Sequence, residues 1–419
     1  MKTAAHAHVI GAGLAGLAAA THLAARGIAV TLFEAAGQAG GRCRSYFDPA
    51  FDGVIDNGNH LVLSGNRAIY QYLNRIGAQH HLAGPSGAVF DFVDLKSGAR
   101  WTLRPNDGPL PWWLTSAARR VPGTSAGDYL AYAKLLFAGR RQSVGDVVSC
   151  KGPLWDRLMQ PFLLAALNTD PCTGSAQLAG AVLKETLAKG GRAYRPRIAT
   201  PNLAAAFIDP ALAFLKAHGA RLQFNERLRD ITFDSRAAAA LEFPDATLPL
   251  GPRDAVILAV PPWIARDLVP RLLAPSEFRS IVNAHFKFPA PPGSPPILGV
   301  IGGTAEWIFA FDDRISVTVS GADAIVDKDR EALAEILWAD VAKALAIPAA
   351  LPKWQIVKEK RATFAATPAQ EAMRPIAATG WRNFFLAGDW TDTGLPATIE
   401  GAVRSGEKAA ALALRQLSL

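Results

Sequence analysis

Cysteine is scarce in this sequence, and long apolar runs are missing. The 419 residues include only three cysteines, Cys43, Cys150 and Cys172. Their spacing fits neither a disulfide framework nor a metal site, so we expect free thiols, no metal and a reducing cytosol. No stretch approaches the ~18 uninterrupted apolar residues of a transmembrane helix. The first residues lead directly into a strand pattern without a signal peptide, which favours a cytoplasmic protein.

Runs of Lys and Arg are also absent, although the chain is basic overall. It has 44 Lys and Arg against 36 Asp and Glu, a net charge of +8. Such a balance suits nucleic acid, an anionic membrane surface or a phosphorylated ligand. Because no nucleic-acid-binding motif is present, nucleic acid is not an expected partner. No internal repeat is visible, and the length allows two or three packed units.

The sequence does contain a glycine-rich turn between two apolar stretches near its start. "HVIGAGLAG" begins with a strand pattern at residues 8–10 and continues through Gly11, Gly13 and Gly16 into a helix pattern. In a dinucleotide-binding βαβ unit the first glycine permits the tight turn. The second lets the backbone approach a pyrophosphate, and the third lets the helix pack closely on the strand. This order of elements predicts a dinucleotide site.

The helix and strand that follow the turn supply the remaining parts of such a site. The helix start at Leu14 and Ala15 offers unpaired N–H groups and a partial positive charge to the phosphates. A second strand pattern ends at Glu34, whose carboxylate suits the two ribose hydroxyls of an adenosine. NAD and FAD both bind to sites of this kind, so the cofactor needs a further criterion.

A second glycine pair supplies that criterion. "GGRCRS" at residues 40–45 places Gly41 and Arg42 in a backbone-rich, cationic loop soon after the second strand. A surface turn is the structural alternative. The position resembles that of the GG-motif FAD enzymes, which include amine oxidases, phytoene desaturases and protoporphyrinogen oxidases. The resemblance implies FAD as the cofactor, with Gly41 and Arg42 close to its pyrophosphate.

The same families close the flavin site with a strand, a Gly-Asp turn and a helix near the carboxyl terminus. "FLAGDWTDTGLPATIEGAVRSG" at residues 385–406 has this pattern, with the turn at Gly388 and Asp389. The resemblance implies that Asp389 approaches the ribityl-pyrophosphate part of FAD. It also implies a helix starting near Thr398 and Ile399 whose N–H groups point at the flavin pyrimidine edge, where negative charge develops on reduction.

The resemblance extends to the fold. It implies an α/β protein in which a Rossmann-type FAD-binding domain is interleaved with a substrate domain made of a mixed sheet and helices. Asn57, Gly58 and the backbone near Leu228 are then further cofactor contacts, with Leu228 beside the adenine. The expected FAD-binding segments are 1–80, 204–270 and 380–419, and the expected substrate-domain segments are 81–203 and 271–379.

Three stretches together narrow the family further. "FDGVIDNGNHLVLSGNRAIYQYLNRIG", "SIVNAHFKF" and the carboxyl-terminal pattern resemble the bacterial hydroxysqualene dehydroxylases of hopanoid biosynthesis, also called squalene-associated FAD-dependent desaturases. The resemblance implies replacement of an allylic hydroxyl of hydroxysqualene by hydrogen, giving squalene. Because hydroxide is a poor leaving group, a general acid must protonate it. His60 and then His285 are the candidates for this catalytic role, and each is otherwise a structural histidine.

Two other functions fit the same pattern. One is an FAD-dependent desaturase or oxidase of a polyisoprenoid or amine, and the other is a non-enzymatic isoprenoid carrier that shares the fold without using FAD. The complete glycine turn, Glu34 and the Gly388-Asp389 turn argue against the carrier. No second dinucleotide motif for NADPH is visible, so the electron donor is open.

A segment rich in Trp and Arg suits a long hydrocarbon substrate. Residues 109–141 combine the pair Trp112 and Trp113 with an apolar stretch and arginines at both ends. Trp at headgroup depth and Arg near anionic lipid form an interfacial anchor, although an ordinary helix with a covered apolar face gives the same pattern. We therefore expect a long-chain isoprenoid substrate and peripheral contact with the inner face of the plasma membrane.

Overall fold

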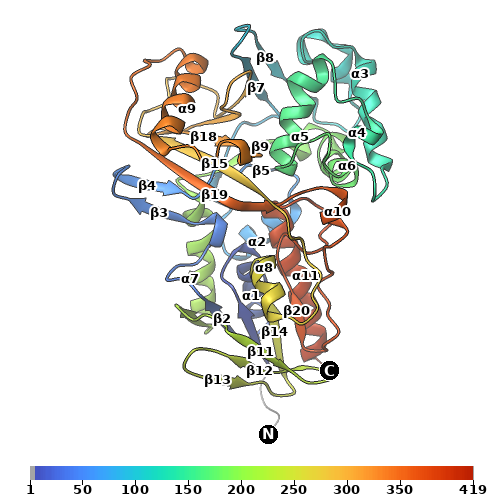
Figure 1. The fold of residues 1–419 in the computed structure, drawn as a ribbon, viewed down its shortest axis with the longest axis vertical. Coiled ribbons are helices and arrows are strands. Elements are labelled where there is room, and N and C mark those ends of the chain that lie inside the picture. The colour runs from blue at the N-terminus through green and yellow to red at the C-terminus, as the bar shows by residue number, and fades with distance from the viewer. Residues whose placement is uncertain (1–4, 419) are drawn as a thin grey trace.

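A computed structural model describes residues 5–418, which form two bodies built from interleaved segments (Figure 1). One body contains a five-stranded parallel sheet with strand order β10-β2-β1-β14-β20. Its strands come from three distant parts of the chain, which confirms the Rossmann-type half and its interleaving. They are β1 (His6–Ile10), β2 (Ala29–Glu34), β10 (Arg221–Phe224), β14 (Asp254–Leu258) and β20 (Phe384–Leu386).

Both faces of the parallel sheet are covered, which agrees with the burial of four consecutive residues in each of β1 and β14. Helices α1 (Leu14–Ala24), α2 (Arg67–Arg75), α7 (Asp209–Ala217) and α11 (Ile399–Leu417) share one hydrophobic core with one face. A small antiparallel sheet covers the other. Gly406 lets α11 lie against α1, because a Cβ there would come 2.1 Å from the carbonyl oxygen of Ala15. The small sheet comprises β11 (Asp230–Phe233), β12 (Ala238–Glu242) and β13 (Thr247–Pro249).

The second body contains a seven-stranded mixed sheet with order β19-β15-β18-β17-β16-β7-β8. Within the described residues 5–418, β16 and β7 pair in parallel, whereas the other neighbouring strands of this sheet pair antiparallel. The sheet lies between α9 on one side and helices α3–α6 on the other (Figure 1). The strands are β7 (Phe90–Asp94), β8 (Arg100–Leu103), β15 (Phe278–Phe286), β16 (Ile297–Ile301), β17 (Trp307–Ala310), β18 (Ile315–Val319) and β19 (Trp354–Phe364).

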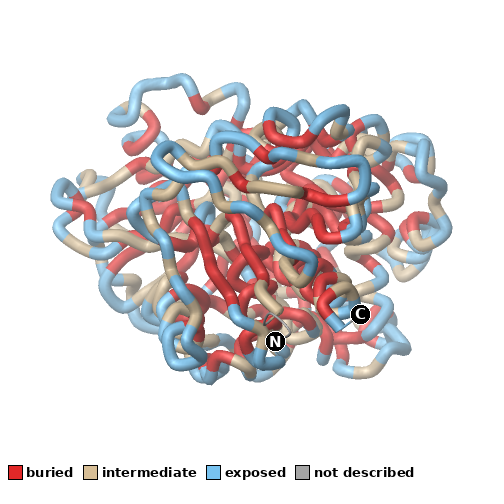
Figure 2. Tube along the Cα trace, turned by 90° about the horizontal axis from the view of Figure 1, so that it is seen from below, coloured by how far each residue is buried: buried red, intermediate tan, exposed pale blue. Residues whose placement is uncertain are grey.

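Side chains alternate between the two faces of this mixed sheet. Val282, Val317 and Ile308 point into the core beneath α9, so their neighbours in sequence face the opposite side, towards α3–α6 and the FAD-binding body. Figure 2 shows buried residues gathered at the centre of the molecule with exposed loops around them. The helices are α3 (Ala126–Ala131), α4 (Val144–Val147), α5 (Gln160–Leu167), α6 (Ala176–Glu185) and α9 (Arg330–Leu345).

Shorter elements connect the two bodies. The expected segment boundaries at 80, 203, 270 and 379 stay predictions. Among the helices of residues 5–418, none has the length and hydropathy to cross a bilayer. The same residues contain no cluster of three or more His, Cys, Asp or Glu placed to hold a metal. The connecting elements are β3 (Ser45–Asp48), β4 (Gly53–Asp56), β5 (Val62–Leu63), β6 (Leu82–Ala83), β9 (Pro196–Ala199), α8 (Pro262–Leu268) and α10 (Pro368–Glu371).

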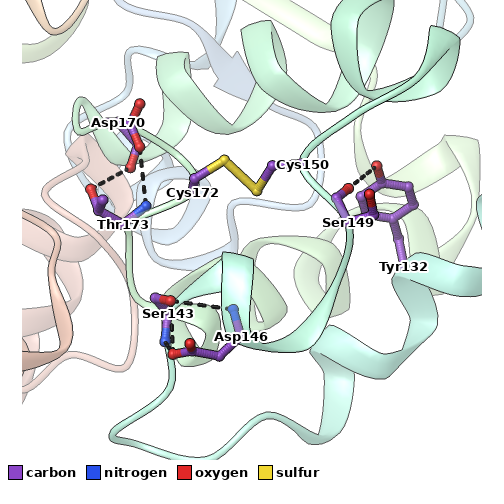
Figure 3. The surroundings of a disulfide bond; sticks show 8 residues. All are labelled: Tyr132, Ser143, Asp146, Ser149, Cys150, Asp170, Cys172 and Thr173. Atoms are coloured by element: carbon purple, nitrogen blue, oxygen red, sulfur yellow. Dashed lines mark hydrogen bonds between the residues drawn. A yellow bond between two sulfur atoms is a disulfide. The ribbon is translucent and has the colours of Figure 1, made fainter.

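The expectation of three free thiols is wrong for two of them. Cys150, after α4, and Cys172, after α5, form a disulfide across 22 residues of sequence (Figure 3). The loops are brought together because the backbone N–H of Gly145 donates to the carbonyl oxygen of Cys172 at 2.9 Å. This pairing depends on the packing of α4 and α5 against α6, which the cysteine spacing does not reveal. Cys43 is free and buried.

Candidate active site

The three glycines of the turn after β1 differ in how closely other atoms approach them. Gly11 has a φ of +103°, and a Cβ there would lie 2.5 Å from the carbonyl oxygen of Ala259. A Cβ on Gly16 would lie 1.8 Å from the carbonyl oxygen of Gly11. Gly13 is different, because a Cβ there would meet nothing within 4 Å. Gly11 and Gly16 are therefore needed by the fold, whereas Gly13 borders room for a ligand.

The start of α1 and the end of β2 meet beside this open space. Leu14 and Ala15 form the first turn of α1, which has no acidic residue to offset its positive end. The carboxylate of Glu34 accepts hydrogen bonds from the backbone N–H of Ala12 at 2.8 Å and of Ala36 at 2.9 Å. These two bonds fix the carboxylate while leaving lone pairs on both oxygens for ligand hydroxyls.

The second glycine loop lies against the first. The backbone N–H of Gly40 donates to the carbonyl oxygen of Ala12 at 2.8 Å, and a Cβ on Gly41 would lie 3.5 Å from Cα of Gly13. The guanidinium of Arg42 pairs with the carboxylate of Asp389 at 2.7 Å. The two glycine loops and the carboxyl-terminal turn therefore converge on one place.

The carboxyl-terminal turn is held rigidly. Gly388 has a φ of +145°, and a Cβ there would lie 2.3 Å from Nε1 of Trp390. Asp389 is buried. The side chain of Thr398 caps α11 by accepting a hydrogen bond from the backbone N–H of Gly401 at 3.1 Å, so the helix begins at Ile399. The predicted start of this helix is confirmed.

The segment after β4 crosses between the two bodies. Asn57 is buried, and its backbone N–H donates to the carbonyl oxygen of Arg44 at 2.9 Å. A Cβ on Gly58 would lie 2.9 Å from Nδ2 of Asn283 in β15. The side chain of Asn59 donates to the hydroxyl of Thr318 in β18 at 3.1 Å. This segment therefore lies on the face of the mixed sheet opposite α9.

His60 ends that segment beside a small cavity. It is half-buried, and burial lowers its pKa to about 4. The cavity is also lined by Asn59, Leu203 and the aromatic rings of Phe309 and Phe311. At neutral pH the imidazole is therefore uncharged, with one nitrogen able to donate and the other able to accept a hydrogen bond.

Comparisons with known proteins identify the family. The family model described as flavin containing amine oxidoreductase matches residues 14–414. Over 408 residues the chain is 56% identical to the hydroxysqualene dehydroxylase of Rhodopseudomonas palustris, covering 97% of this chain and 98% of that protein. It is 51% identical to the hydroxysqualene dehydroxylase of Sinorhizobium fredii, with 98% of each chain covered. The chain belongs to the hydroxysqualene dehydroxylase family.

Solved structures with this fold include flavin oxidases of low sequence similarity. Cyclohexylamine oxidase from Brevibacterium oxydans has a TM-score of 0.73 at 18% identity, covering 99% of this chain and all of that one. Putrescine oxidase bound to putrescine has a TM-score of 0.69 at 17% identity, covering 98% of this chain and 99% of that one. These likenesses confirm the expected fold class. This chain therefore shares the fold of these two amine oxidases.

The family assignment confirms the predicted flavin cofactor, FAD, and the site residues fit it. Gly13 leaves room that any Cβ would occupy, α1 presents an uncompensated amino terminus, and Glu34 offers carboxylate oxygens. The loop carrying Leu228 returns beside Glu34, since the backbone N–H of Glu226 donates to the carbonyl oxygen of Glu34 at 2.9 Å. The individual contacts of these residues with FAD stay predictions.

The surroundings of His285, the second candidate for the general acid, leave neither ring nitrogen free. It is fully buried in β15, where Nδ1 lies 2.8 Å from the hydroxyl of Ser316 and Nε2 lies 2.9 Å from the carbonyl oxygen of Asp56. Burial lowers its pKa to about 4. Because Asp56 O can only accept, Nε2 carries the proton and Nδ1 accepts from Ser316. Both ring nitrogens are therefore bonded to the protein.

Glu400 has a role that the sequence did not reveal. An acidic residue in the first turn of a helix usually acts on the dipole of that helix, here α11. The carboxylate of Glu400 instead accepts from the backbone N–H groups of Ala68 and Ile69, at 3.1 and 3.0 Å, in the first turn of α2. It thereby caps a different helix. No local pattern could have predicted a contact between residues 332 positions apart.

Proposed function

We propose that the protein uses reduced FAD to convert hydroxysqualene to squalene, as a step in squalene and hopanoid biosynthesis. The observation that carries this proposal is the similarity over nearly the whole chain to hydroxysqualene dehydroxylases. Bound FAD would supply two electrons and a hydrogen to the carbon that loses oxygen. The protein's own task is to hold the long apolar substrate, protonate the departing oxygen and exclude water.

The reaction is tested with the chemically reduced holoenzyme and hydroxysqualene in the absence of oxygen. We expect squalene to form, detected by gas chromatography with mass spectrometry, while the flavin absorbance returns to that of the oxidised form. Deuterium carried by the reduced cofactor should appear on the carbon that lost its hydroxyl. Substrate consumption without squalene, or products with additional double bonds, would overturn the proposal in favour of a desaturase.

His60 is the predicted general acid, since it borders a cavity while both nitrogens of His285 are bonded to the protein. His60→Ala should slow squalene formation by ~100-fold or more if His60 donates the proton. His80→Ala is the matched control, because His80 is exposed. FAD content should be unchanged in both variants. The lowered pKa of His60 works against this role, because little imidazolium is present at neutral pH.

We further propose peripheral contact with the inner face of the plasma membrane, which places the protein in the cytoplasm. Large apolar side chains are exposed between residues 110 and 137, and we call them the apolar tip. Arg119 lies 4.6 Å over the ring of Trp112. Arg140 and Arg141 are exposed nearby in sequence and suit anionic lipid. The apolar tip comprises Leu110, Trp112, Leu130 and Phe137, with exposed fractions of 77%, 56%, 63% and 89%.

The expected Trp pair is corrected by the structure, because Trp113 is only 4% exposed and packs in the core. The membrane test therefore uses Trp112→Ser with Phe137→Ser. We expect this variant to float less with liposomes of anionic lipid than the parent, while retaining FAD. Leu273→Ser is the control, because Leu273 is 70% exposed outside the apolar tip. If the parent does not bind the liposomes, the proposed contact is wrong.

A further inference from the structure

Two polar side chains lie next to each other on the face of the mixed sheet opposite α9. Asn283 in β15 and Thr318 in β18 are direct partners across the two strands. Val317, next to Thr318 in sequence, points into the core beneath α9, so Thr318 and its partner point the other way. Asn59, the residue before His60, is hydrogen-bonded to both of them. This group therefore links the sheet to the segment that ends at His60.

The direction of each hydrogen bond in this group follows from the one member that can only donate. The backbone N–H of Asn59 lies 3.4 Å from Oδ1 of Asn283, which is therefore an acceptor. The hydroxyl of Thr318 lies 2.8 Å from the same oxygen, so its hydrogen is used there. Thr318 can then only accept from Asn59, whose Nδ2 donates to it at 3.1 Å. The side-chain amide of Asn59 is thereby fixed with its nitrogen towards the sheet.

The other polar atom of this amide is left open. Oδ1 of Asn59 accepts no hydrogen bond from any of residues 5–418. It is also accessible, because the fully buried side-chain atoms without a partner in this part of the chain all belong to other residues. A fixed acceptor that no protein group uses is available to a ligand that carries a donor.

The small cavity beside His60 is also lined by Asn59. The space that admits the centre of a water-sized group is about 10 Å³ there, which suits one hydroxyl oxygen. Most of the remaining wall is apolar, which suits the hydrocarbon that carries such a hydroxyl. The apolar lining residues are Ile198, Ala199, Leu203, Phe309 and Phe311.

One carboxyl also borders the cavity, but other protein groups hold it. Oδ1 of Asp56 accepts from the hydroxyl of Ser45 at 2.5 Å and from the backbone N–H of Leu203 at 3.0 Å. Its Oδ2 lies 3.7 Å from the guanidinium of Arg314. The amide oxygen of Asn59 is therefore an uncharged acceptor that this cavity offers to a ligand.

We propose that Asn59 binds the hydroxyl of hydroxysqualene, with Oδ1 of the amide accepting the hydrogen bond from the substrate O–H. This inference rests on the proposed dehydroxylation and names a residue that selects its substrate. The bond holds the substrate oxygen at the cavity and leaves the lone pairs of that oxygen free to receive a proton. Squalene cannot make this bond, so its entry would leave the amide oxygen without a partner. Asn59 therefore favours the substrate over the product.

The test measures how strongly the oxidised holoenzyme prefers hydroxysqualene to squalene. Each hydrocarbon is titrated at the same detergent concentration, and bound ligand is measured by mass spectrometry after gel filtration. In the parent, the dissociation constant for squalene should exceed that for hydroxysqualene by ~10-fold or more. Asn59→Leu keeps the approximate size of the side chain without its oxygen, so this ratio should fall to about 1–2.

Two changes at Thr318 test the orientation of the amide. Thr318→Val removes the acceptor that holds Nδ2, so Asn59 can turn and the ratio should fall by ~3-fold or more. Thr318→Ser keeps the hydroxyl and should retain the ratio of the parent. Asn74→Leu is the matched control, since Asn74 is exposed in α2. FAD content should be unchanged in all four variants. If Asn59→Leu does not fold, the two Thr318 variants decide the question.

The outcomes separate this inference from the proposed function. A parent without preference for hydroxysqualene, or an Asn59→Leu variant that keeps the parent's ratio, overturns the role of Asn59 and leaves dehydroxylation intact. A parent that forms no squalene in the turnover test overturns the proposed function, whatever the ratio. Loss of the preference in Asn59→Leu and Thr318→Val, but not in Thr318→Ser or Asn74→Leu, supports Asn59 as the residue that binds the hydroxyl.

Discussion

The carboxylate of Glu400 should be one of the larger single contributions to stability in this fold. It is 3% exposed and accepts two backbone hydrogen bonds from the first turn of α2, plus one from Arg404 at 3.0 Å. Helix α2 has no side-chain cap of its own at Asn66 and no acidic residue in its first turn. Glu400 therefore supplies both the missing acceptors and the missing negative charge.

The cost of removing it follows from these bonds. A hydrogen bond to a charged group contributes about 1.5–3 kcal/mol, and a buried donor left without an acceptor costs a similar amount. Glu400→Ala leaves two buried N–H groups unpaired, so we expect the free energy of unfolding to fall by about 3–5 kcal/mol. Glu400→Gln retains one acceptor oxygen without the charge and should lose about half as much.

The assay is urea denaturation at a fixed excess of FAD, followed by circular dichroism. Glu335→Ala serves as the control, because Glu335 is exposed on α9 and should change stability by no more than about 0.5 kcal/mol. If Glu400→Ala loses no more stability than this control, the assignment of Glu400 as the cap of α2 is refuted.

Three further expectations concern other parts of the molecule. Gly13→Val should fold but purify without flavin absorbance, because a Cβ there meets no protein atom within 4 Å and the side chain extends into the predicted ligand space; a yellow variant would contradict this. Burial alone would raise the pKa of Glu407, but hydrogen bonds from His22 and Arg75 lower it. Glu407 therefore stabilises the fold above the unfolded carboxyl pKa and loses this effect as the pH falls, so Glu407→Gln should flatten the acid side of the stability profile. Cys150→Ser should lower stability by about 3 kcal/mol in oxidising buffer and leave it unchanged with a reductant, measured by urea denaturation.

The sequence predicted the parts of the site whose contacts are local. The glycine turn, the first residues of α1 and the end of β2 follow one another within residues 8–34, so the spacing alone indicates their arrangement. The carboxyl-terminal turn was also predictable, because the strand, the turn at Gly388 and Asp389 and the start of the helix follow one another within one short segment. Arg42 and Asp389 were each selected from their own motifs, and the fold joins them in an ion pair.

Other features depend on which elements meet, and the sequence could not predict them. Trp112 and Trp113 are adjacent and chemically identical, yet one is exposed and the other buried, since only one faces the core. His285 was a candidate for the general acid, yet both of its ring nitrogens are bonded to the protein, one to Ser316 and the other to the carbonyl oxygen of Asp56.

The interleaved order of the strands has a consequence for how the protein is made. Strand β20 completes the parallel sheet beside β14, and α11 packs along α1. The elements that are synthesised first therefore reach their final packing only after the last elements have been synthesised. Long-range pairing of this kind slows folding and leaves the edges of the sheet unpaired during translation. The Arg42–Asp389 pair forms only at that stage. Because the carboxyl-terminal turn is a predicted part of the FAD site, we expect capture of FAD to be a late event in biogenesis. A cell short of the cofactor would then accumulate chains whose β-edges are vulnerable to proteases and to aggregation.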